Sequence, residues 1–349
     1  MFPNMALWLK LLLATAVSFT AALLMTPQVK KFAEKIGAMD VPKDERRVHN
    51  HPIPRMGGLA IFIGFLLSLL IFSDMNTKVM GMLIGASLIV GMGAVDDIVS
   101  LSPWVKLGVQ VAAALVVIRC GIMFDAITNP LFFSDINRIE IGLLAVPITV
   151  IWIVGCTNAV NLIDGLDGLA VGVSAISSIT MLVVALFLEE PDVAVILCAL
   201  TGACLGFVPY NLNPAKIFMG DVGSQFLGFV LATVSIIGLF KLHAIITFLV
   251  PLMALAIPLA DTVFAFCRRI LHGQSPFVAD KGHFHHRLLA MGLNQKQAVA
   301  VLYGVSAVLG LLAVLLAGTS GTVKAVCIVI SFAIAITVWL FVFRKKPKK

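Results

Sequence analysis

Acidic residues in short polar breaks between apolar stretches are the first candidates for chemistry. Asp96 and Asp97 are adjacent, and Asp164 and Asp167 follow one another within the segment 158–168. Adjacent carboxylates repel one another, so a pair near a membrane needs a cation or a proton to offset it. The pattern indicates a Mg2+ site or a carboxylate of raised pKa that acts as a base, and for Asp96 and Asp97 an ordinary solvated loop stays open as an alternative.

The break 158–168 also carries amides and glycines. Asn158 and Asn161 precede the two aspartates, and Gly165 and Gly168 follow them. Glycine permits positive φ and close approach of the backbone to a ligand. Amide and carboxylate oxygens suit a hard cation, and the same groups can bind phosphate or hydroxyl groups. The segment lacks EF-hand spacing, so it favours a magnesium or substrate site over a calcium loop.

A third break brings Asn211, Phe218 and Asp221 together just ahead of an apolar stretch. If a helix begins there, its free N–H groups and its dipole favour an anion such as a phosphate. Asp221 is then either a ligand of that site or only the N-cap of the helix. The sequence leaves both interpretations open.

A fourth feature is the histidine segment, in which His283, His285 and His286 stand directly before Arg287. With no cysteine in the run, this group favours binding of a diphosphate by cations and N–H donors. Zinc ligation and a solvated loop are the alternatives. The basic segment 43–58 could receive a second phosphate, or could serve only as a positive anchor at the membrane.

Helices in a membrane must position these residues. The chain of 349 residues is 60% hydrophobic and only 12% charged, whereas soluble domains carry about 25% charge. Apolar runs long enough to cross a bilayer predict about eleven transmembrane helices, and therefore an all-α polytopic integral membrane protein. The runs are 6–26, 56–73, 79–95, 104–122, 140–157, 169–188, 193–210, 223–240, 243–265, 298–318 and 322–343.

The distribution of charge predicts the topology. With the N-terminus outside and the C-terminus in the cytoplasm, 19 of the 25 Lys and Arg residues lie on the inner side, as the positive-inside rule expects. The net charge of +7 then needs anionic lipid and no nucleic acid. We predict one transmembrane catalytic domain, 1–349, in the plasma (inner) membrane. Its active site on the cytoplasmic face is built from the loops 27–55, 96–106, 158–168, 211–222 and 261–297.

Five ordered motifs resemble the prenyl-phosphate N-acetylhexosamine-1-phosphate transferase superfamily, glycosyltransferase family 4. They are Pro54-Arg55-Met56-Gly57-Gly58, Asp96-Asp97, Asn158-Ala159-Val160-Asn161 leading into Asp164-Gly165-Leu166-Asp167-Gly168-Leu169, Phe218-Met219-Gly220-Asp221-Val222-Gly223-Ser224, and His283-Phe284-His285-His286-Arg287-Leu288. Phe284 interrupts the histidine run. The segment therefore resembles the GlcNAc-1-phosphate branch (WecA or TagO type), because the phospho-MurNAc-pentapeptide branch typically has three consecutive histidines.

The resemblance implies transfer of GlcNAc-1-phosphate from UDP-GlcNAc to undecaprenyl phosphate with release of UMP, which initiates synthesis of a teichoic acid or lipopolysaccharide O-antigen. It implies Mg2+ as cofactor, with Mn2+ as an alternative. The alternative functions are a phospho-MurNAc-pentapeptide transferase and, in a different class, an ion-coupled transporter. Expected partners are the two substrates and membrane lipids, and a homodimer stays open. So does the choice between direct attack and an aspartyl-phosphate intermediate.

The resemblance also implies roles for individual residues. As catalytic residues, Asp96 or Asp97 would deprotonate or position the lipid phosphate, while Asp164 and Asp167 would shape the nucleotide-sugar pocket. Asp221 and Asn161 would ligate the metal. The substrate-binding residues would be Lys106 at a phosphate, Asn211 and Phe218 at the uridine, His283, His285, His286 and Arg287 at the sugar-phosphate, and Asn158 with Asn161.

Overall fold

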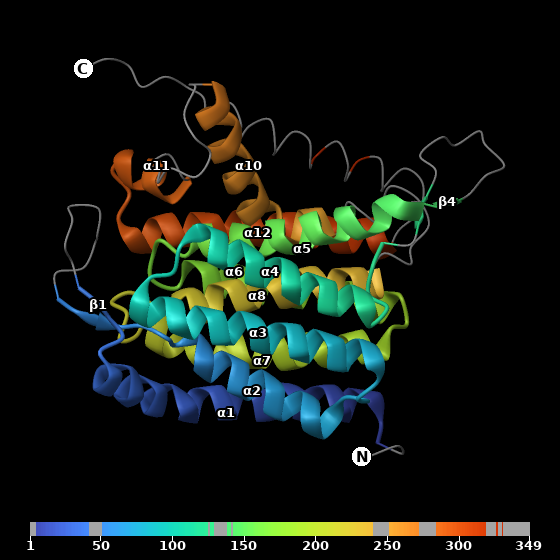
Figure 1. Cartoon of the computed structure of the whole chain (residues 1–349), viewed down its shortest axis with the longest axis horizontal. Helices are drawn as coiled ribbons and strands as arrows, with labels where there is room; N and C mark the ends of the chain where they lie inside the picture. Colours follow the sequence, from blue (N-terminus) through green and yellow to red (C-terminus); the bar gives the residue numbers. More distant parts are fainter. Residues whose placement is uncertain are drawn as a thin grey trace.

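The computed structural model describes residues 5–41, 51–124, 126–128, 138–140, 142–239, 251–271 and 284–318, together with residues 326 and 330. Long helices run side by side in a bundle (Figure 1). They are α1 (Leu7–Ile36), α2 (Gly58–Phe72), α3 (Thr77–Val99), α4 (Pro103–Arg119), α5 (Ala145–Ile163), α6 (Leu169–Phe187), α7 (Pro191–Asn211), α8 (Gly220–Val234), which continues in the π-helical turn η2 (Ser235–Leu239), and α12 (Gln295–Gly318). Two further helices, α10 (Ala256–Leu271) and the short α11 (Phe284–Ala290), stand outside this row (Figure 1). A 3-10 turn, η1 (Gly142–Leu144), precedes α5.

Two short antiparallel hairpins are the exceptions to the all-α prediction. In one, β1 (Met39–Asp40) pairs with β2 (Ile53–Pro54), and in the other β3 (Ala126–Thr128) pairs with β4 (Arg138–Glu140). The first hairpin follows α1 and leads into α2. It therefore stands at the same end of the bundle as the turns that carry the predicted site residues (Figure 1).

The first helix is longer than predicted. It continues through Pro27 to Ile36 instead of ending near residue 26, and it stops at Gly37, whose φ of 76° is left-handed. A proline inside a helix removes one hydrogen bond and usually marks its end. In a membrane the freed carbonyl is more readily tolerated, because neighbouring helices can satisfy it.

The other segments predicted as loops are also helical in part. Asp96 and Asp97 lie inside α3, Asn158 and Asn161 lie inside α5, and Asn211 is the last residue of α7. The segment 261–297 likewise contains the end of α10, all of α11 and the start of α12. The prediction treated polar residues as helix ends. A helix satisfies its own backbone, however, and can carry polar side chains as long as these find partners in the bundle.

Helices α1 to α8 alternate in direction, so alternate ends meet on one side. That side collects the carboxyl ends of α1, α3, α5 and α7 and the amino ends of α2, α4, α6 and α8. The start of α1 lies at the opposite end, where β4 also lies (Figure 1). This alternation brings residues from five separate parts of the sequence to one end of the bundle.

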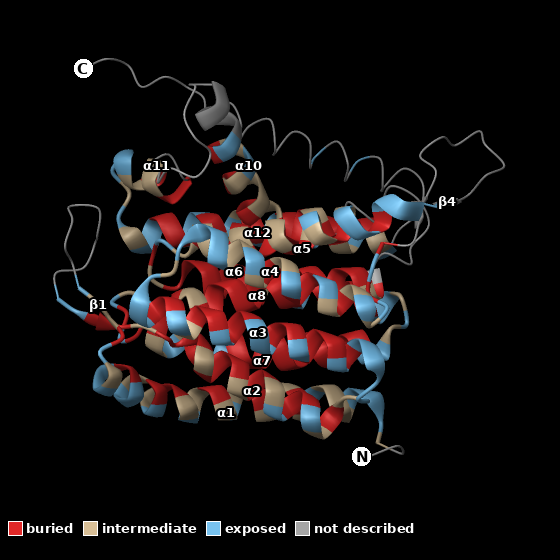
Figure 2. Ribbon diagram, viewed as in Figure 1, coloured by how far each residue is buried: buried red, intermediate tan, exposed pale blue. Residues whose placement is uncertain are grey.

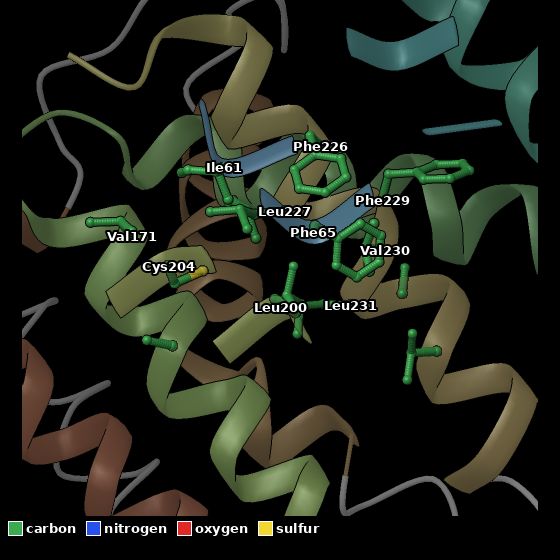
Figure 3. Close-up of a cluster of buried hydrophobic side chains, with 14 of the residues drawn as sticks. Ile61, Phe65, Val171, Leu200, Cys204, Phe226, Leu227, Phe229, Val230 and Leu231 are labelled. Carbon is green, nitrogen blue, oxygen red and sulfur yellow. The ribbon is translucent and has the colours of Figure 1, made fainter. Parts of the chain in front are cut away.

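Helix α8 is the centre of the bundle. Residues along its length are buried, and Figure 2 shows it enclosed by the surrounding helices. Phe62 and Phe65 of α2 pack edge-on against Phe226 of α8, with ring centroids 5.5 and 5.4 Å apart. Figure 3 shows Phe226 and Phe229 among the buried side chains of this core. The core therefore holds the amino end of α8, which bears Asp221, in a fixed place.

The outer helix faces suit lipid. Large apolar side chains such as Leu12, Leu24 and Ile151 are exposed. Trp8 and Trp104 are exposed at opposite ends of the bundle, as in the aromatic belts of membrane proteins. Within the described residues, seven helices are long and apolar enough to cross a membrane, and Gly58–Phe72 and Ala256–Phe266 are shorter apolar helices. The protein is thus an all-α polytopic membrane protein. The last predicted span, 322–343, lies almost wholly outside the described residues.

Candidate active site

A cavity of about 500 Å3 opens where the alternate helix ends meet. Its volume lies within the range of about 300–1,000 Å3 that is typical of small-molecule sites. It is lined by residues of the first hairpin and of the turns after α5 and α7, and by the first residues of α8 and α12. The polar lining residues are Asp40, His51, Arg55, Asn161, Asp164, Asp167, Asn211, Asn213, Asp221 and Gln295, and the others include Phe218 and Gly220.

Asp221 is held on several sides at the start of α8. Its Oδ2 accepts hydrogen bonds from Lys106 Nζ and from Gln225 Nε2, each at 2.7 Å. Its Oδ1 accepts one from Asn161 Nδ2 at 3.2 Å. A carboxylate has about four acceptor sites. These three donors therefore leave about one site for a ligand in the cavity.

Asp97 reaches α8 from α3 and caps it. Its carboxylate accepts hydrogen bonds from the backbone N–H groups of Asp221 (3.1 Å) and Val222 (3.4 Å). A carboxylate at a helix amino end is stabilised by these free N–H groups and by the helix dipole. Arg55 lies 3.6 Å from the same carboxylate, whose side chain is fully buried. Asp97 therefore lies behind the cavity wall, where it fixes Asp221.

Asp96 faces the other way along the turn between α3 and α4. It accepts a hydrogen bond from the backbone N–H of Leu101 (2.7 Å), and it forms an ion pair with Lys106 Nζ (2.7 Å). Ser102 caps α4 through the N–H of Val105, which fixes the start of the helix that carries Lys106. One ammonium group thus bridges Asp96 and Asp221, while Asp97 has its own partners in Arg55 and the N–H groups of α8, so each carboxylate of the adjacent pair has a separate donor.

Glycines allow the backbones to approach closely around Asp221. A Cβ on Gly58 would lie 2.0 Å from the Cα of Gly223, and one on Gly93 would lie 2.6 Å from the Cα of Val222. The backbone N–H of Gly58 donates to the carbonyl of Met219 (2.8 Å), and Phe218 donates to the carbonyl of Pro54 (2.8 Å). The Pro-Arg-Met-Gly-Gly motif therefore packs on the segment that ends at Asp221.

Asp164 lies in the cavity wall directly after α5. Burial raises the pKa of this carboxyl from 3.8 to about 7, and the nearby carboxylates, Asp221 first among them, add to the rise. Arg55 opposes the rise. Asp164 can therefore change its protonation near neutral pH, which suits a group that accepts a proton during a reaction.

Asp167 and Asn211 tie the two turns together. Asp167 accepts hydrogen bonds from Asn213 Nδ2 (2.9 Å) and from the Ala215 N–H (3.0 Å). Asn211 accepts one from the Gly168 N–H (3.1 Å) and donates one to the carbonyl of Ile217 (3.0 Å). Both residues line the cavity. Because the Asn211 amide already bonds to the backbone on both sides, these contacts indicate that it shapes the site rather than binds uridine through a free amide.

The two amides of α5 have different surroundings. Asn161 lines the cavity and donates to Asp221 and to Ser224 Oγ (2.8 Å), so its carbonyl oxygen is left to accept from, or coordinate, a ligand. Asn158 lies one turn further from the cavity and pairs with Gln110 in the bundle. The geometry therefore does not support the prediction that Asn158 binds substrate.

The histidine segment meets the turn 164–168. The ring of His285 lies against Gly165, where a Cβ would come within 2.4 Å of Nε2. His285 is buried, and its ring lies beside that of His286, with the centroids 4.3 Å apart and the ring planes tilted by 43°. The backbone N–H of Phe284 donates to Asp261 of α10 (2.8 Å). Arg287 follows in α11, and His283 lies outside the described residues.

The donor set at the cavity suits Mg2+. Carboxylate oxygens of Asp164 and Asp221 and the Asn161 carbonyl line the same space, and Mg2+ usually takes one or two carboxylates and completes its shell with water and substrate phosphates. Across the described residues, no group of three or more His, Cys, Asp or Glu side chains could hold a metal alone. A zinc site of that composition is therefore not present in the described part of the chain.

Sequence reasoning missed several residues of the cavity. Asp40, His51, Asn213 and Gln295 line it, and each lies in a loop predicted to build the site, but none was singled out, because no motif distinguishes them from other polar loop residues. Arg55 was predicted as part of a basic segment and of the Pro-Arg-Met-Gly-Gly motif, without a role of its own, yet it lines the cavity and lies beside Asp97. Its place in that motif, directly before the glycine pair, was the available signal.

Membrane helices around a cavity lined by carboxylates, amides and Arg55 define the class of the protein: an integral membrane protein with a site for a charged ligand. Residues 79–239 match the family described as Glycosyl transferase family 4. A "Probable undecaprenyl-phosphate N-acetylglucosaminyl 1-phosphate transferase" of Bacillus subtilis (strain 168) is 41% identical over 311 residues, which cover 88% of this chain and 85% of that protein. The chain belongs to glycosyl transferase family 4.

Two further relatives are similar over most of their length. A "Decaprenyl-phosphate N-acetylglucosaminephosphotransferase" of Mycobacterium tuberculosis (strain ATCC 25618 / H37Rv) is 34% identical, with 82% of this chain and 78% of that protein covered. An "Undecaprenyl-phosphate alpha-N-acetylglucosaminyl 1-phosphate transferase" of Escherichia coli (strain K12) is 29% identical, with the same two coverages. These similarities favour the GlcNAc-1-phosphate branch over the pentapeptide branch and over a transporter.

Proposed function

We propose that the protein transfers GlcNAc-1-phosphate from UDP-GlcNAc to undecaprenyl phosphate, giving undecaprenyl-diphospho-GlcNAc and UMP. The observation that carries the proposal is one cavity that joins a carboxyl of pKa about 7, Asp164, to the Asp221 and Asn161 oxygens and to the cation Arg55. A sugar diphosphate needs oxygens for its metal ion and cations for its charge. The names of the relatives support the two substrates.

In the proposed reaction, an oxygen of the carrier phosphate attacks the β-phosphorus of UDP-GlcNAc. The bond from that phosphorus to the bridging oxygen breaks, and the oxygen leaves with UMP. Asp164 takes the proton when the carrier phosphate enters as its monoanion. Arg55 lines the cavity and offsets phosphate charge. Asp97 is bound to the N–H groups of α8, so direct attack is a better fit to this arrangement than an intermediate on that carboxylate.

We propose Mg2+ as the cofactor, with Mn2+ as a substitute. Asp221 and Asn161 would hold it beside Asp164, and the bound ion would neutralise charge on the diphosphate and on the leaving UMP. The remaining parts position these groups. Lys106 and Asp97 fix Asp221, and the contact of His285 with Gly165, which lines the cavity, supports a role for the histidine segment at the sugar-phosphate.

We also propose that eleven helices cross the plasma membrane with the N-terminus outside and the cavity in the cytoplasm. The cavity side carries the basic residues Lys30, Lys31 and Lys35 near the end of α1, as the positive-inside rule expects. Single cysteines placed at residue 75, at the far end, and at residue 213 test this. Reagents applied outside cells should label only residue 75, and reversed labelling would overturn the orientation.

The activity is tested with purified protein, UDP-GlcNAc, undecaprenyl phosphate and Mg2+. We expect release of UMP, which a chelator stops and added Mg2+ restores. UDP-GalNAc and UDP-MurNAc-pentapeptide in parallel reactions identify the donor. Asp164→Asn should lower the rate strongly, whereas Asp192→Asn, a carboxylate at the far end of α7, is the matched control and should not. No UMP under conditions in which the Bacillus subtilis relative releases it would refute the proposal.

A further inference from the structure

Three amide side chains connect α4, α5 and α8 behind the cavity. They are Gln110, Asn158 and Gln225, here called the amide chain. Gln110 Nε2 donates to Gln225 Oε1 (2.9 Å) and to Asn158 Oδ1 (3.2 Å), and Asn158 Nδ2 donates back to Gln110 Oε1 (2.7 Å). Gln110 and Gln225 are each only 1% exposed. Such groups are costly to bury in a membrane protein unless their hydrogen bonds are made.

The amide chain has a direction, and it ends at Asp221. An amide has one accepting end and one donating end. Asn158 is anchored by its second bond, to the carbonyl of Val154 (2.8 Å), and it sets the orientation of Gln110. Gln110 then donates a hydrogen bond to the side-chain oxygen of Gln225, so the NH2 group of Gln225 faces the other way and donates to Asp221 Oδ2 (2.7 Å).

We propose that the amide chain is a positioning device for Asp221, and that Gln225 is its decisive member. Gln225 and Lys106 together occupy Oδ2, so the remaining capacity of the carboxylate lies on Oδ1, beside Asn161 and the cavity. None of the three amides lines the cavity, so they act on a bound cation only through Asp221. The inference rests on the proposed function insofar as Asp221 is a ligand of Mg2+.

The competing explanation is packing alone. Polar side chains also hold membrane helices together by hydrogen bonds, and a loss of activity would then follow only from a loss of stability. The two explanations differ in what they predict for the metal. Groups that orient a metal ligand typically change metal affinity or activity by about 10- to 100-fold when they are removed, whereas loss of a packing contact leaves the affinity of the folded fraction unchanged.

The test uses Gln225→Met, which keeps an unbranched side chain of similar length but removes the donor. Thr233→Val is the matched control, because Thr233 is a buried polar residue of α8 whose hydroxyl donates within its own helix, to the carbonyl of Phe229 (2.7 Å). Binding of Mn2+ to each detergent-purified protein without substrates is measured by electron paramagnetic resonance, and the Mg2+ concentration for half-maximal UMP release is measured in parallel. Thermal unfolding reports stability.

We expect Gln225→Met to raise the half-saturating concentration of Mn2+ and of Mg2+ by about 10-fold or more, with a smaller change in the KM for UDP-GlcNAc. Gln110→Leu removes the bond that orients Gln225 but leaves the bond from Gln225 to Asp221. It should raise the half-saturating concentrations of both metals by a smaller factor, and it replaces Gln225→Met in the test if that variant does not fold. Thr233→Val should shift neither.

Unchanged Mn2+ binding by Gln225→Met and Gln110→Leu would overturn the inference, whatever happens to activity or stability, and would assign the amide chain to packing. The Mn2+ measurement needs no substrate. Absence of UMP release by the natural sequence would therefore refute the proposed function, while the dependence of Mn2+ binding on Gln225 would still test the amide chain.

Discussion

A single methyl group added to α3 at Gly93 should push α3, which carries Asp97, away from the start of α8, which carries Asp221. A Cβ on Gly93 would lie 2.6 Å from the Cα and N of Val222, at the amino end of α8, and ordinary contact begins near 3.4 Å. Gly93→Ala therefore requires a shift of about 0.8 Å between α3 and α8. That shift draws Asp97 away from the N–H groups of Asp221 and Val222.

The expected cost can be divided into two parts. Overpacking costs about 1–3 kcal/mol, and the gain from Gly to Ala in a helix returns about 1 kcal/mol, so the free energy of unfolding should fall by no more than about 2 kcal/mol. A misplacement of about 1 Å in catalytic groups can cost about 100-fold in rate. We therefore expect UMP release to fall by roughly two orders of magnitude in a protein that still folds.

Gly91→Ala is the matched control, because Gly91 is exposed on the same helix and a Cβ there meets nothing within 4 Å. It should keep the natural rate and lose no stability. UMP release at saturating substrates and Mg2+ is compared for the two variants, with thermal unfolding in the same detergent. If Gly93→Ala retained a rate within about threefold of Gly91→Ala, the close contact of α3 with α8 would not be what positions Asp221.

Two further outcomes follow from the charges at the site. Lys106→Met removes an ammonium group, a quarter exposed, that bridges Asp96 and Asp221. Breaking a fully buried ion pair costs about 3–5 kcal/mol, so we expect the free energy of unfolding to fall by an amount near or below the lower end of that range. The melting temperature should fall, and Asp96→Asn should partly restore it; an unchanged melting curve would contradict this. Because the pKa of Asp164 is raised to about 7 and the proposed base is the ionised form, kcat/KM should rise as pH increases through about 7. Asp164→Asn should abolish that rise, and a pH profile unaffected by this substitution would assign the base to another group.

Much of the fold could be predicted from hydropathy, because each helix from α2 to α8 coincides with an apolar run. The ends of helices were harder to predict. Asp96 and Asp97 read as a break between spans, yet α3 continues through both to Val99. Hydropathy measures transfer from water to lipid, whereas these side chains leave water for partners inside the protein, among them Lys106 and the N–H groups of α8.

Much of the site could also be predicted, since Asn161, Asp164, Asp167, Asn211, Phe218 and Asp221 all line one cavity. What the sequence does not contain is the direction of each polar group. Asn158 and Asn161 are three residues apart and chemically identical, but Asn158 pairs with Gln110 across the bundle and Asn161 with Asp221. The choice depends on how α5 is rotated against α4 and α8, which only the packed structure fixes.

The distribution of counter-charges identifies the group most suited to move a proton. Four carboxylates near the cavity have donors that hold them in place. They are Asp96 and Asp221, which share Lys106, Asp97, which binds the N–H groups of α8 beside Arg55, and Asp167, which binds Asn213 and the Ala215 N–H.

Asp164 differs from these four. Within the part of the chain that the structure describes, it accepts no hydrogen bond, and the neighbouring carboxylates add to the effect of burial on its pKa. Asp221, Asp97 and Asp167, the carboxylates that act on Asp164, are held in place by their donors, so their charges stay beside Asp164 when it ionises. The same contacts that fix Asp221 for a cation thus hold the pKa of Asp164 near 7, and a cation bound beside it would lower that pKa. Metal binding and proton acceptance should therefore be coupled at this site.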